Sequence, residues 1–279
     1  MKIAVLLTSF NRKLKTLDCL KGLQEQCLPV GVELKIFLTD DASTDGTAEA
    51  VKETFPNVAI ISGTGYLYWA GGMRTAWRKA LPCSPDYYLL LNDDTTLVPN
   101  AISILIETSL KHGSERAVVI GSTCDGFGIT TYGGWSIRSR VLVWIARRIH
   151  PQSESVDCDY GNGNILLVPQ YCVRKIGILS NHFTHSLADY DFTLRAKKAG
   201  FSLKLAPGYL GVCINDHGKP WKSENNSFSE RMNHLKDSKG IAYKEHLRFI
   251  RDHFPLTYPW QFFNLWFKTL FPFASYLNR

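Results

Sequence analysis

The sequence contains no uninterrupted apolar run of about 18 residues, so we expect no membrane-spanning helix. Its seven cysteines are odd in number, with no Cys-x-x-Cys pair and no spacing suited to a zinc site. This pattern favours reduced thiols and a cytoplasmic protein. The first residues carry one lysine, Lys2, before a short apolar run, and no small-residue cleavage site follows, so we expect a first strand there rather than a signal peptide. Neither a GxGxxG motif nor a P-loop is present, so these two nucleotide fingerprints do not apply.

What the composition does provide is enough apolar material for a core and an excess of positive charge. With 279 residues and 45% hydrophobic residues, the chain can bury one large α/β core, and we expect an enzyme-sized body with an appendage. The formal net charge of +7 could attract nucleic acid, anionic lipid or phosphorylated substrates. Because the basic residues are interleaved with acids and form no long stripe, we expect no nucleic-acid binding.

The segment around residues 85–98 combines a buried strand with a pair of acids. Residues 87–91 (YYLLL) form an unbroken apolar run that predicts a strand buried on both faces. Directly after this apolar run come three polar residues, Asn92, Asp93 and Asp94. Two adjacent carboxylates at a sheet edge repel each other and lose solvation, so they favour a cation. Their hard oxygens suit Mg²⁺ or Mn²⁺, whereas the simpler interpretation is a solvated turn with two surface acids.

Earlier in the chain, strands and helices alternate. Residues 2–8, 32–39 and 58–62 predict three further strands, each followed by a polar or glycine-rich turn and a helical pattern. Four strands that alternate with helices predict an open parallel sheet, in which ligands bind outside the carboxyl ends of the strands. The residues that would line this edge are Thr8, Ser9, Asp40, Asp41, the loop 63–74, Asp93 and Asp94.

The second half of the chain is less regular. Residues 117–120 and 201–205 predict strands, the region 121–157 predicts variable loops, and residues 159–169 open with a turn onto another strand. Asp189 and Asp191 stand at the start of a helical pattern, where the positive helix end stabilises acids without any further role. Residues 221–279 are polar and then aromatic, and predict a helical extension.

Seven motifs occur in a recognisable order: TSFNR (8–12), TDDAST (39–44), WAGG (69–72), NDD (92–94), GNG (161–163), ADYDFTLR (188–195) and a late His217. In this order the chain resembles the family 2 glycosyltransferases of the GT-A fold, particularly the bacterial rhamnosyltransferase-like branch that assembles surface polysaccharides. The resemblance covers residues 1 to about 220. It implies a Rossmann-like, mostly parallel central sheet flanked by helices, and an inverting transfer of a sugar from a nucleotide-diphosphate sugar, such as a dTDP- or UDP-sugar, to an acceptor hydroxyl.

The resemblance also implies roles for individual residues. Asp41 looks like the base- or ribose-binding acid, Asp94 like the metal ligand for Mg²⁺ or Mn²⁺, and Asp189 like the catalytic base. His217 looks like a further ligand to the metal or the diphosphate. The other expected contacts are Thr8, Ser9, Asp40, Gly71, Gly72, Arg74 and Asp93 with the nucleotide sugar, and Gly163, Asn164 and Asp191 with the acceptor. The chain departs from the family pattern at two positions, where Asn92 replaces an acid and Ala188 replaces a glutamate.

From the same resemblance we expect a catalytic domain at 1–220, with a nucleotide-sugar half at 1–100 and an acceptor half at 101–220, and a helical extension at 221–279. Within that extension Trp260, Phe263, Phe267 and Leu270 fall on one helical face. This face either packs on the catalytic body or lies in a membrane interface, where a glycan or lipid-linked acceptor would be met at the inner face of the cytoplasmic membrane.

Two other functions remain open at this point. A sugar nucleotidyltransferase shares this type of sheet, but the Gly-rich basic loop that it carries after its first strand is missing from TSFNRKLK. A catalytically inactive nucleotide-sugar or glycan-binding module on the same fold is supported by Asn92 and Ala188 and opposed by the retained Asp93, Asp94 and Asp189.

Overall fold

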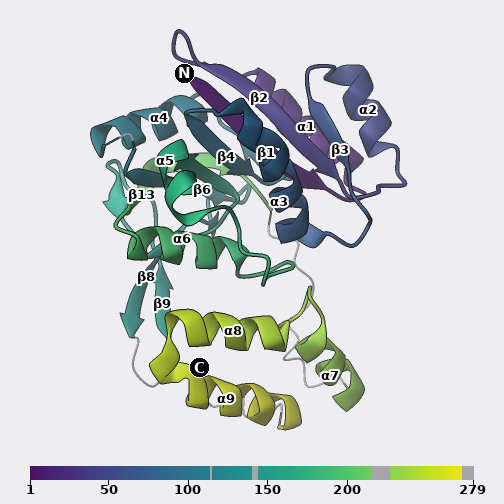
Figure 1. The fold of residues 1–279 in the computed structure, drawn as a ribbon, viewed down its shortest axis with the longest axis vertical. Coiled ribbons are helices and arrows are strands. Elements are labelled where there is room, and N and C mark those ends of the chain that lie inside the picture. Colours follow the sequence, from purple (N-terminus) through teal and green to yellow (C-terminus); the bar gives the residue numbers. More distant parts are fainter. Residues whose placement is uncertain (114, 140–143, 215–226, 272–279) are drawn as a thin grey trace.

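The computed structural model describes residues 1–113, 115–139, 144–214 and 227–271. The chain forms a ten-stranded central sheet with helices on both faces, a small three-stranded sheet and a group of C-terminal helices (Figure 1). The predicted α/β class, with a central sheet flanked by helices, is confirmed. Within the described ranges, no helix is both long and apolar enough to cross a lipid bilayer.

The first half of the sheet is entirely parallel. The strands lie in the order β3–β2–β1–β4. Their bounds are β1 (Lys2–Ser9), β2 (Glu33–Asp40), β3 (Ala59–Ser62) and β4 (Tyr87–Leu91), with α1 (Lys13–Gln24), α2 (Thr47–Thr54), α3 (Tyr68–Ala80) and the 3₁₀ turn η1 (Leu81–Cys83) between them. The carboxyl ends of all four strands therefore meet at one edge of the sheet.

The second half of the sheet mixes directions. β12 runs antiparallel to both β4 and β6, and β6 runs parallel to β13, which also pairs with β10 and β5. The bounds are β5 (Thr96–Leu97), β6 (Ala117–Cys124), β7 (Thr130–Tyr132), β10 (Val156–Asp157), β12 (Ile165–Pro169) and β13 (Ser202–Val212), and the small sheet contains β11 (Tyr160–Gly161), β8 (Gly134–Ser139) and β9 (Ile145–Arg148). Because β12 is antiparallel to β4, the loop before β12 reaches the edge where β4 ends.

Two hydrophobic clusters, one on each face, hold the sheet between the helices. Alternate residues of one strand enter opposite clusters: Tyr88 and Leu90 face α3 and α6 (Ala188–Lys198), whereas Leu89 faces α1 and α4 (Ala101–Lys111). Trp77 of α3 is fully buried and contacts the ring of Phe192 in α6, with centroids 5.3 Å apart. The continuous apolar runs of the sequence are thus explained by burial on both faces.

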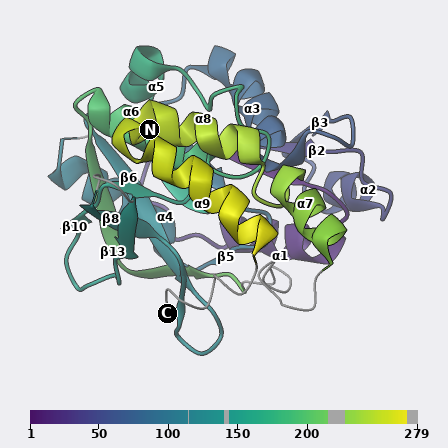
Figure 2. The ribbon, with the colours of Figure 1, turned by 90° about the horizontal axis from the view of Figure 1, so that it is seen from below.

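The C-terminal helices form a separate layer on the underside of the body (Figures 1 and 2). They are α7 (Phe228–Lys236), α8 (Tyr243–His253), the 3₁₀ turn η2 (Pro255–Thr257) and α9 (Tyr258–Leu270), and α5 (Gln170–Ile176) belongs to the body. α8 packs against α6, and α9 packs against α7 and α8. Helices are therefore present in the predicted extension, while the proposed domain boundaries remain a prediction.

Candidate active site

Polar residues from distant parts of the chain meet at the carboxyl edge of β1, β2 and β4. The strand registers place Ser9 beside Asp40 and Asp40 beside Ser62. Asn164, just before β12, accepts the backbone N–H of Asn92 through its carbonyl oxygen at 3.0 Å. The structure thus brings the carboxyl ends of the first strands and the GNG loop (161–163) to one edge of the sheet.

Asp93 is buried at this edge, with only 5% of its surface exposed. Its Oδ2 accepts a hydrogen bond from Thr16 Oγ1 at 3.3 Å, and that hydroxyl lies 2.8 Å from Ser9 Oγ. The pKa of Asp93 is raised to about 6, chiefly by burial, while the Arg12 charge opposes the rise and the Asp94 charge adds to it. The negative charge of Asp93 is therefore only partly compensated.

Asp94 is neutralised by a residue that was not among the predicted site residues. Its Oδ2 accepts a short hydrogen bond from Arg12 Nη1, which also lies 3.5 Å from Asp93 Oδ1. Its Oδ1 lies 3.4 Å from Cys213 Sγ, which donates to it. The Arg12 side chain remains 37% exposed, so a cation already faces the acidic pair from the solvent side. Arg12 belongs to the TSFNR motif, and the need of paired acids for a cation was the signal that could have identified it.

The oxygen ligands at this edge suit a hard divalent cation whose remaining ligands come from a substrate. Asp93 and Asp94 supply carboxylate oxygens, and Mg²⁺ and Mn²⁺ are commonly held by one or two carboxylates together with phosphate oxygens. No cluster of three or more His, Cys, Asp or Glu side chains suited to a metal occurs in the described part of the chain. His217, the predicted further ligand, lies outside the described residues. A hollow of about 170 Å³ lies beside Asp94 and is lined also by Lys15 and Asp18.

Asp40, the last residue of β2, and Asp41, the next residue, are both predicted nucleotide-sugar contacts, and their carboxylates differ in their hydrogen bonds. Asp41 accepts three backbone N–H groups of the next loop, from Thr64 at 3.0 Å and from Gly65 and Leu67 at 2.8 Å. Asp40 Oδ1, by contrast, is buried and has no hydrogen-bond partner within the described residues. Asp41 therefore shapes the loop, and Asp40 carries the acceptor oxygen that is left for a ligand.

The residues of α3 that are predicted to contact the nucleotide sugar, Gly71, Gly72 and Arg74, also make contacts within the fold. A Cβ atom at Gly72 would lie 1.9 Å from Thr8 Oγ1, so this glycine allows α3 to pack directly on β1. At Gly71 a Cβ atom would lie 3.1 Å from Leu67 Cβ. Arg74 is buried, and its Nη1 donates to the carbonyl oxygens of Ser180 at 2.8 Å and Phe183 at 2.7 Å. These contacts hold the helix and the segment 180–183 in place.

Asp189 occupies the first turn of α6 and is half-buried. Its Oδ2 accepts the N–H of Gly163 and its Oδ1 the N–H of Tyr190, both at 2.9 Å. Burial raises the pKa of Asp189, and the backbone N–H groups oppose the rise without cancelling it. The side chain is thus fixed in direction and has a greater tendency to take a proton than an ordinary aspartate.

An indole ring links Asp189 to the acidic pair. A Cβ atom at Gly163 would lie 2.7 Å from the Trp69 ring and 3.2 Å from Asp189 Cβ, so only glycine fits between them. Trp69 Nε1 donates to Asn92 Oδ1 at 2.8 Å. A continuous series of contacts therefore runs from Asp189 through Gly163 and Trp69 to Asn92, the residue that precedes Asp93. The neutral amide oxygen of Asn92 accepts the Trp69 N–H without adding a third negative charge beside Asp93 and Asp94.

Asp191, the third predicted acceptor residue, is engaged in hydrogen bonds within the fold. It is 4% exposed and accepts hydrogen bonds from Arg195 Nε and His253 Nε2, both at 2.8 Å. Burial would raise its pKa, but the His253 hydrogen bond and the Arg195 charge outweigh burial and lower it. Both oxygens thus connect α6 to itself and to α8, and the expected contact of Asp191 with the acceptor stays a prediction.

Comparison with known proteins decides the family. A model of glycosyl transferase family 2 matches residues 4–164, more than half of the chain. The protein belongs to this family. No match was found among curated proteins.

Solved structures place this family 2 glycosyltransferase in the GT-A fold. It is similar to S. aureus TarS 1–349 in complex with UDP, with a TM-score of 0.57, 16% identity, and 91% of this chain and 72% of that chain covered. It is also similar to the mannosyltransferase PcManGT from Pyrobaculum calidifontis in complex with GDP-Man and Mn²⁺, with a TM-score of 0.51, 17% identity, and 84% and 61% covered. This chain thus spans less than two thirds of the mannosyltransferase chain. At these identities the likeness concerns the fold, and it confirms the predicted architecture.

Backbone strain in the glycosyltransferase gathers around the same edge. Within the described residues, six non-glycine residues have positive φ, and four of them adjoin the site: Asn11 (53°), Ala42 (60°), Tyr68 (51°) and Leu187 (66°). They flank Arg12, Asp41, Trp69 and the start of α6. Such conformations cost about 1–3 kcal/mol each and concentrate at functional sites, so the strain supports the placement of the active site here.

Proposed function

We propose that this family 2 enzyme is an inverting, metal-assisted glycosyltransferase. It would move a hexosyl or deoxyhexosyl group, as in the rhamnosyltransferase-like branch, from a nucleotide-diphosphate sugar to a hydroxyl of a glycan or lipid-linked acceptor in surface-polysaccharide synthesis. The observation that carries the proposal is the presence of two separate carboxylate centres with raised pKa, Asp93 and Asp189, linked by Trp69 at one sheet edge. A transfer reaction needs such a division between a leaving-group side and an acceptor side.

The donor would lie over the ends of β1, β2 and β4. TarS carries UDP and PcManGT carries GDP-Man in their structures, which supports a nucleotide-bound sugar here, with a dTDP- or UDP-sugar as our expectation. Asp40 Oδ1 would accept a hydrogen bond from a base N–H or a ribose hydroxyl, because it is a buried acceptor without a partner in the described chain. Lys15 and Arg12 would place positive charge beside the diphosphate.

Mg²⁺ or Mn²⁺ would be held by Asp94, with Asp93 beside it, and PcManGT offers a neighbour with Mn²⁺. When bound, the ion supplies positive charge that stabilises the departing diphosphate. Without the ion, Arg12 compensates one of the two negative charges, because its single guanidinium contacts both acids. The raised pKa of Asp93 supports the same assignment, because an added positive charge would relieve its uncompensated negative charge.

Asp189 would act as the general base. As the acceptor oxygen attacks the anomeric carbon, its proton passes to the Asp189 carboxylate, the new C–O bond forms, and the bond to the diphosphate breaks. A single displacement of this kind inverts the anomeric configuration. The raised pKa makes Asp189 a better proton acceptor near neutral pH, and its two backbone hydrogen bonds fix its position.

Asn92 and Ala188 support the second candidate, an inactive nucleotide-sugar-binding module. Both functions predict nucleotide binding, and only the first predicts turnover. Release of nucleoside diphosphate from the matching sugar nucleotide, in the presence of a bacterial membrane extract that supplies acceptors, therefore distinguishes them.

The decisive experiment for the donor site is thermal unfolding with UDP, dTDP or GDP, each with and without Mn²⁺. A ligand at about a hundred times its dissociation constant adds roughly 2.7 kcal/mol of stability, which raises Tm by a few degrees. We expect one diphosphate to give a Mn²⁺-dependent shift that Asp94→Ala abolishes. Asp157→Ala is the matched control, because its side chain is 78% exposed in a surface pair with Lys204. If no nucleotide shifts the wild type, the proposed donor site is wrong.

A further inference from the structure

The outward face of α9 is an exposed aromatic surface. On the opposite side of the helix, Leu265 and Thr269 are buried against the other C-terminal helices. The outward side chains are Trp260, Phe263, Phe267 and Leu270, followed by Phe271 just beyond the helix, and between 38% and 58% of each is exposed. The rings contact one another in sequence along the helix, with centroid distances of 6.5, 5.6 and 5.2 Å. An apolar surface of this kind marks an interaction site rather than scattered exposure.

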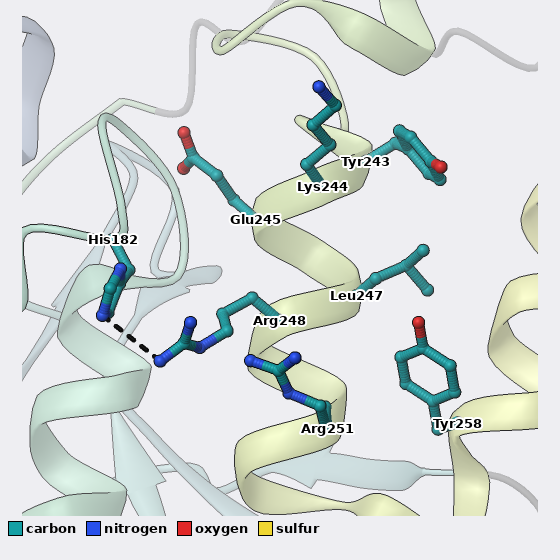
Figure 3. Close-up of a pocket in the computed structure, with 8 residues that line it drawn as sticks. All are labelled: His182, Tyr243, Lys244, Glu245, Leu247, Arg248, Arg251 and Tyr258. Atoms are coloured by element: carbon teal, nitrogen blue, oxygen red, sulfur yellow. Dashed lines mark hydrogen bonds between the residues drawn. The ribbon is translucent and has the colours of Figure 1, made fainter.

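α8, which packs against α9, presents a basic flank. Lys244, Arg248 and Arg251 line a hollow of about 420 Å³ together with one acid, Glu245, and with His182 and Tyr258. Figure 3 shows Arg248 and Arg251 in front of α8, with His182 on one side and Tyr258 on the other. Arg248 Nη2 donates a hydrogen bond to His182 Nε2 at 3.2 Å, which fixes the Arg248 side chain at the edge of the hollow.

Basic residues outnumber acidic residues in this region. Glu245 is engaged by Thr184, whose N–H and hydroxyl donate to it at 3.0 and 2.8 Å. Asp252 pairs with Arg248 at 2.6 Å and with Arg251 at 3.3 Å. Between residues 227 and 271 the sequence has seven Lys and Arg residues and four Asp and Glu residues. An anion entering the hollow would therefore meet a net positive field.

An anionic lipid surface matches both features. α8 and α9 pack side by side, so the basic flank lies about one helix diameter, roughly 10 Å, from α9. This separation is comparable to the Debye length of about 10 Å at 0.1 M salt, so both features can act on one surface. Trp and Phe favour the interfacial zone of a bilayer, and Lys and Arg favour its anionic phosphates. A second copy of this chain would instead bring another basic flank, and like charges would repel.

We propose that α9 docks its aromatic face into the interface of an anionic membrane, while Lys244, Arg248 and Arg251 contact lipid phosphates. The docking does not depend on the proposed transfer chemistry. It would, however, have a consequence for that chemistry, because His253 of α8 is bound to Asp191 of α6, the helix that carries Asp189. Membrane contact through α8 and α9 would hold the proposed base at a defined height above lipid-linked acceptors.

The test is co-sedimentation of the full chain with phosphatidylcholine vesicles, with and without phosphatidylglycerol. We expect binding to the phosphatidylglycerol vesicles, and at least a tenfold loss in the double variant Phe263→Glu/Phe267→Glu. The matched control is Phe127→Glu, which alters a 94% exposed phenylalanine in the turn between β6 and β7 and should bind as the wild type does. In Lys244→Glu/Arg251→Glu, binding should fall about fivefold or more per residue and depend less on salt.

Three results would overturn the proposal. The first is no binding of the wild type to either vesicle, and the second is undiminished binding of the Phe263→Glu/Phe267→Glu variant. The third is a wild-type dimer in light scattering that this variant converts to a monomer, because the aromatic face would then join two copies of the chain. Far-UV circular dichroism confirms that each variant is folded, and because no nucleotide is needed, failure here is separate from failure of the donor site.

Discussion

Asp93 and Asp191 are buried to almost the same extent, with 5% and 4% of their surface exposed, yet their pKa values shift in opposite directions. Asp191, at the junction of α6 and α8, receives a hydrogen bond from His253 and an ion pair from Arg195. Asp93, at the strand edge, receives a hydroxyl donor, and the nearby Arg12 lies closer to Asp94. Equal burial therefore has opposite consequences.

The difference separates structure from function among the buried acids. A carboxylate whose charge is fully matched within the fold holds two elements together and has nothing left to offer a ligand. A carboxylate whose charge is only partly matched is costly to the fold, and such groups gather at functional sites. On this criterion Asp189 resembles Asp93, although it lies two residues from Asp191 on the same helix.

The largest effect is expected at Asp189. Asp189→Asn keeps the size of the side chain and removes the proton acceptor, so kcat should fall about 10²- to 10⁴-fold. Nucleotide binding should be unchanged, because the substitution leaves the strand edge intact. Nucleoside diphosphate release measures the rate, and the nucleotide-induced rise in Tm measures binding. A variant with full activity would show that the base is another residue.

The next effect is expected at Asp191. Asp191→Asn gives the part-exposed Arg195 and the buried His253 a neutral partner in place of a carboxylate, which should cost about 3 kcal/mol of unfolding free energy, the lower end of the range for a broken buried ion pair. The folded-state pKa of Asp191 is lowered, so its contribution is fully present above the ordinary aspartate pKa of about 3.9 and is lost as pH falls through the folded value.

Urea unfolding at pH 7 and below pH 4 checks both statements, and the difference between wild type and Asp191→Asn should shrink in acid. A variant of unchanged stability with a raised KM for acceptor would instead support the contact with the acceptor that the sequence predicts.

The sequence predicts the scaffold well, because the scaffold depends on local pattern. Residues 87–91 were predicted to form a strand and form β4 with the same bounds, since an apolar run of this length is buried on both faces. β13 is longer than the run 201–205 suggests and extends to Val212. Its register with β6 shifts after Leu205, at a bulge that hydrophobic pattern alone does not reveal.

The sequence predicts at which edge of the sheet the site lies, but it does not predict the individual side-chain contacts there. Strand order determines which loops meet, and alternation of strands and helices indicates that order. Which acid is left unmatched depends on loop backbone, as when three N–H groups of residues 64–67 engage Asp41 and leave Asp40 Oδ1 without a partner in the described chain. The Arg12 contact with Asp94 likewise depends on the turn after β1, which no periodicity specifies.

The smallest effect, and the one of opposite sign, is expected at Asp93. The folded-state pKa of about 6 exceeds the ordinary value of about 3.9, so ionisation of Asp93 opposes folding as pH rises between these values, and fully above pH 6. A shift of two pKa units corresponds to roughly 3 kcal/mol at most, and an asparagine is never charged. Asp93→Asn should therefore raise Tm by a few degrees at pH 8, and by less at pH 5, while it weakens nucleotide binding. Thermal melting at both pH values is the measurement, with Asp191→Asn as the control that loses stability.

If Asp93→Asn lowers Tm at pH 8 as Asp191→Asn does, the charge of Asp93 is matched within the fold and the contrast between the two acids disappears.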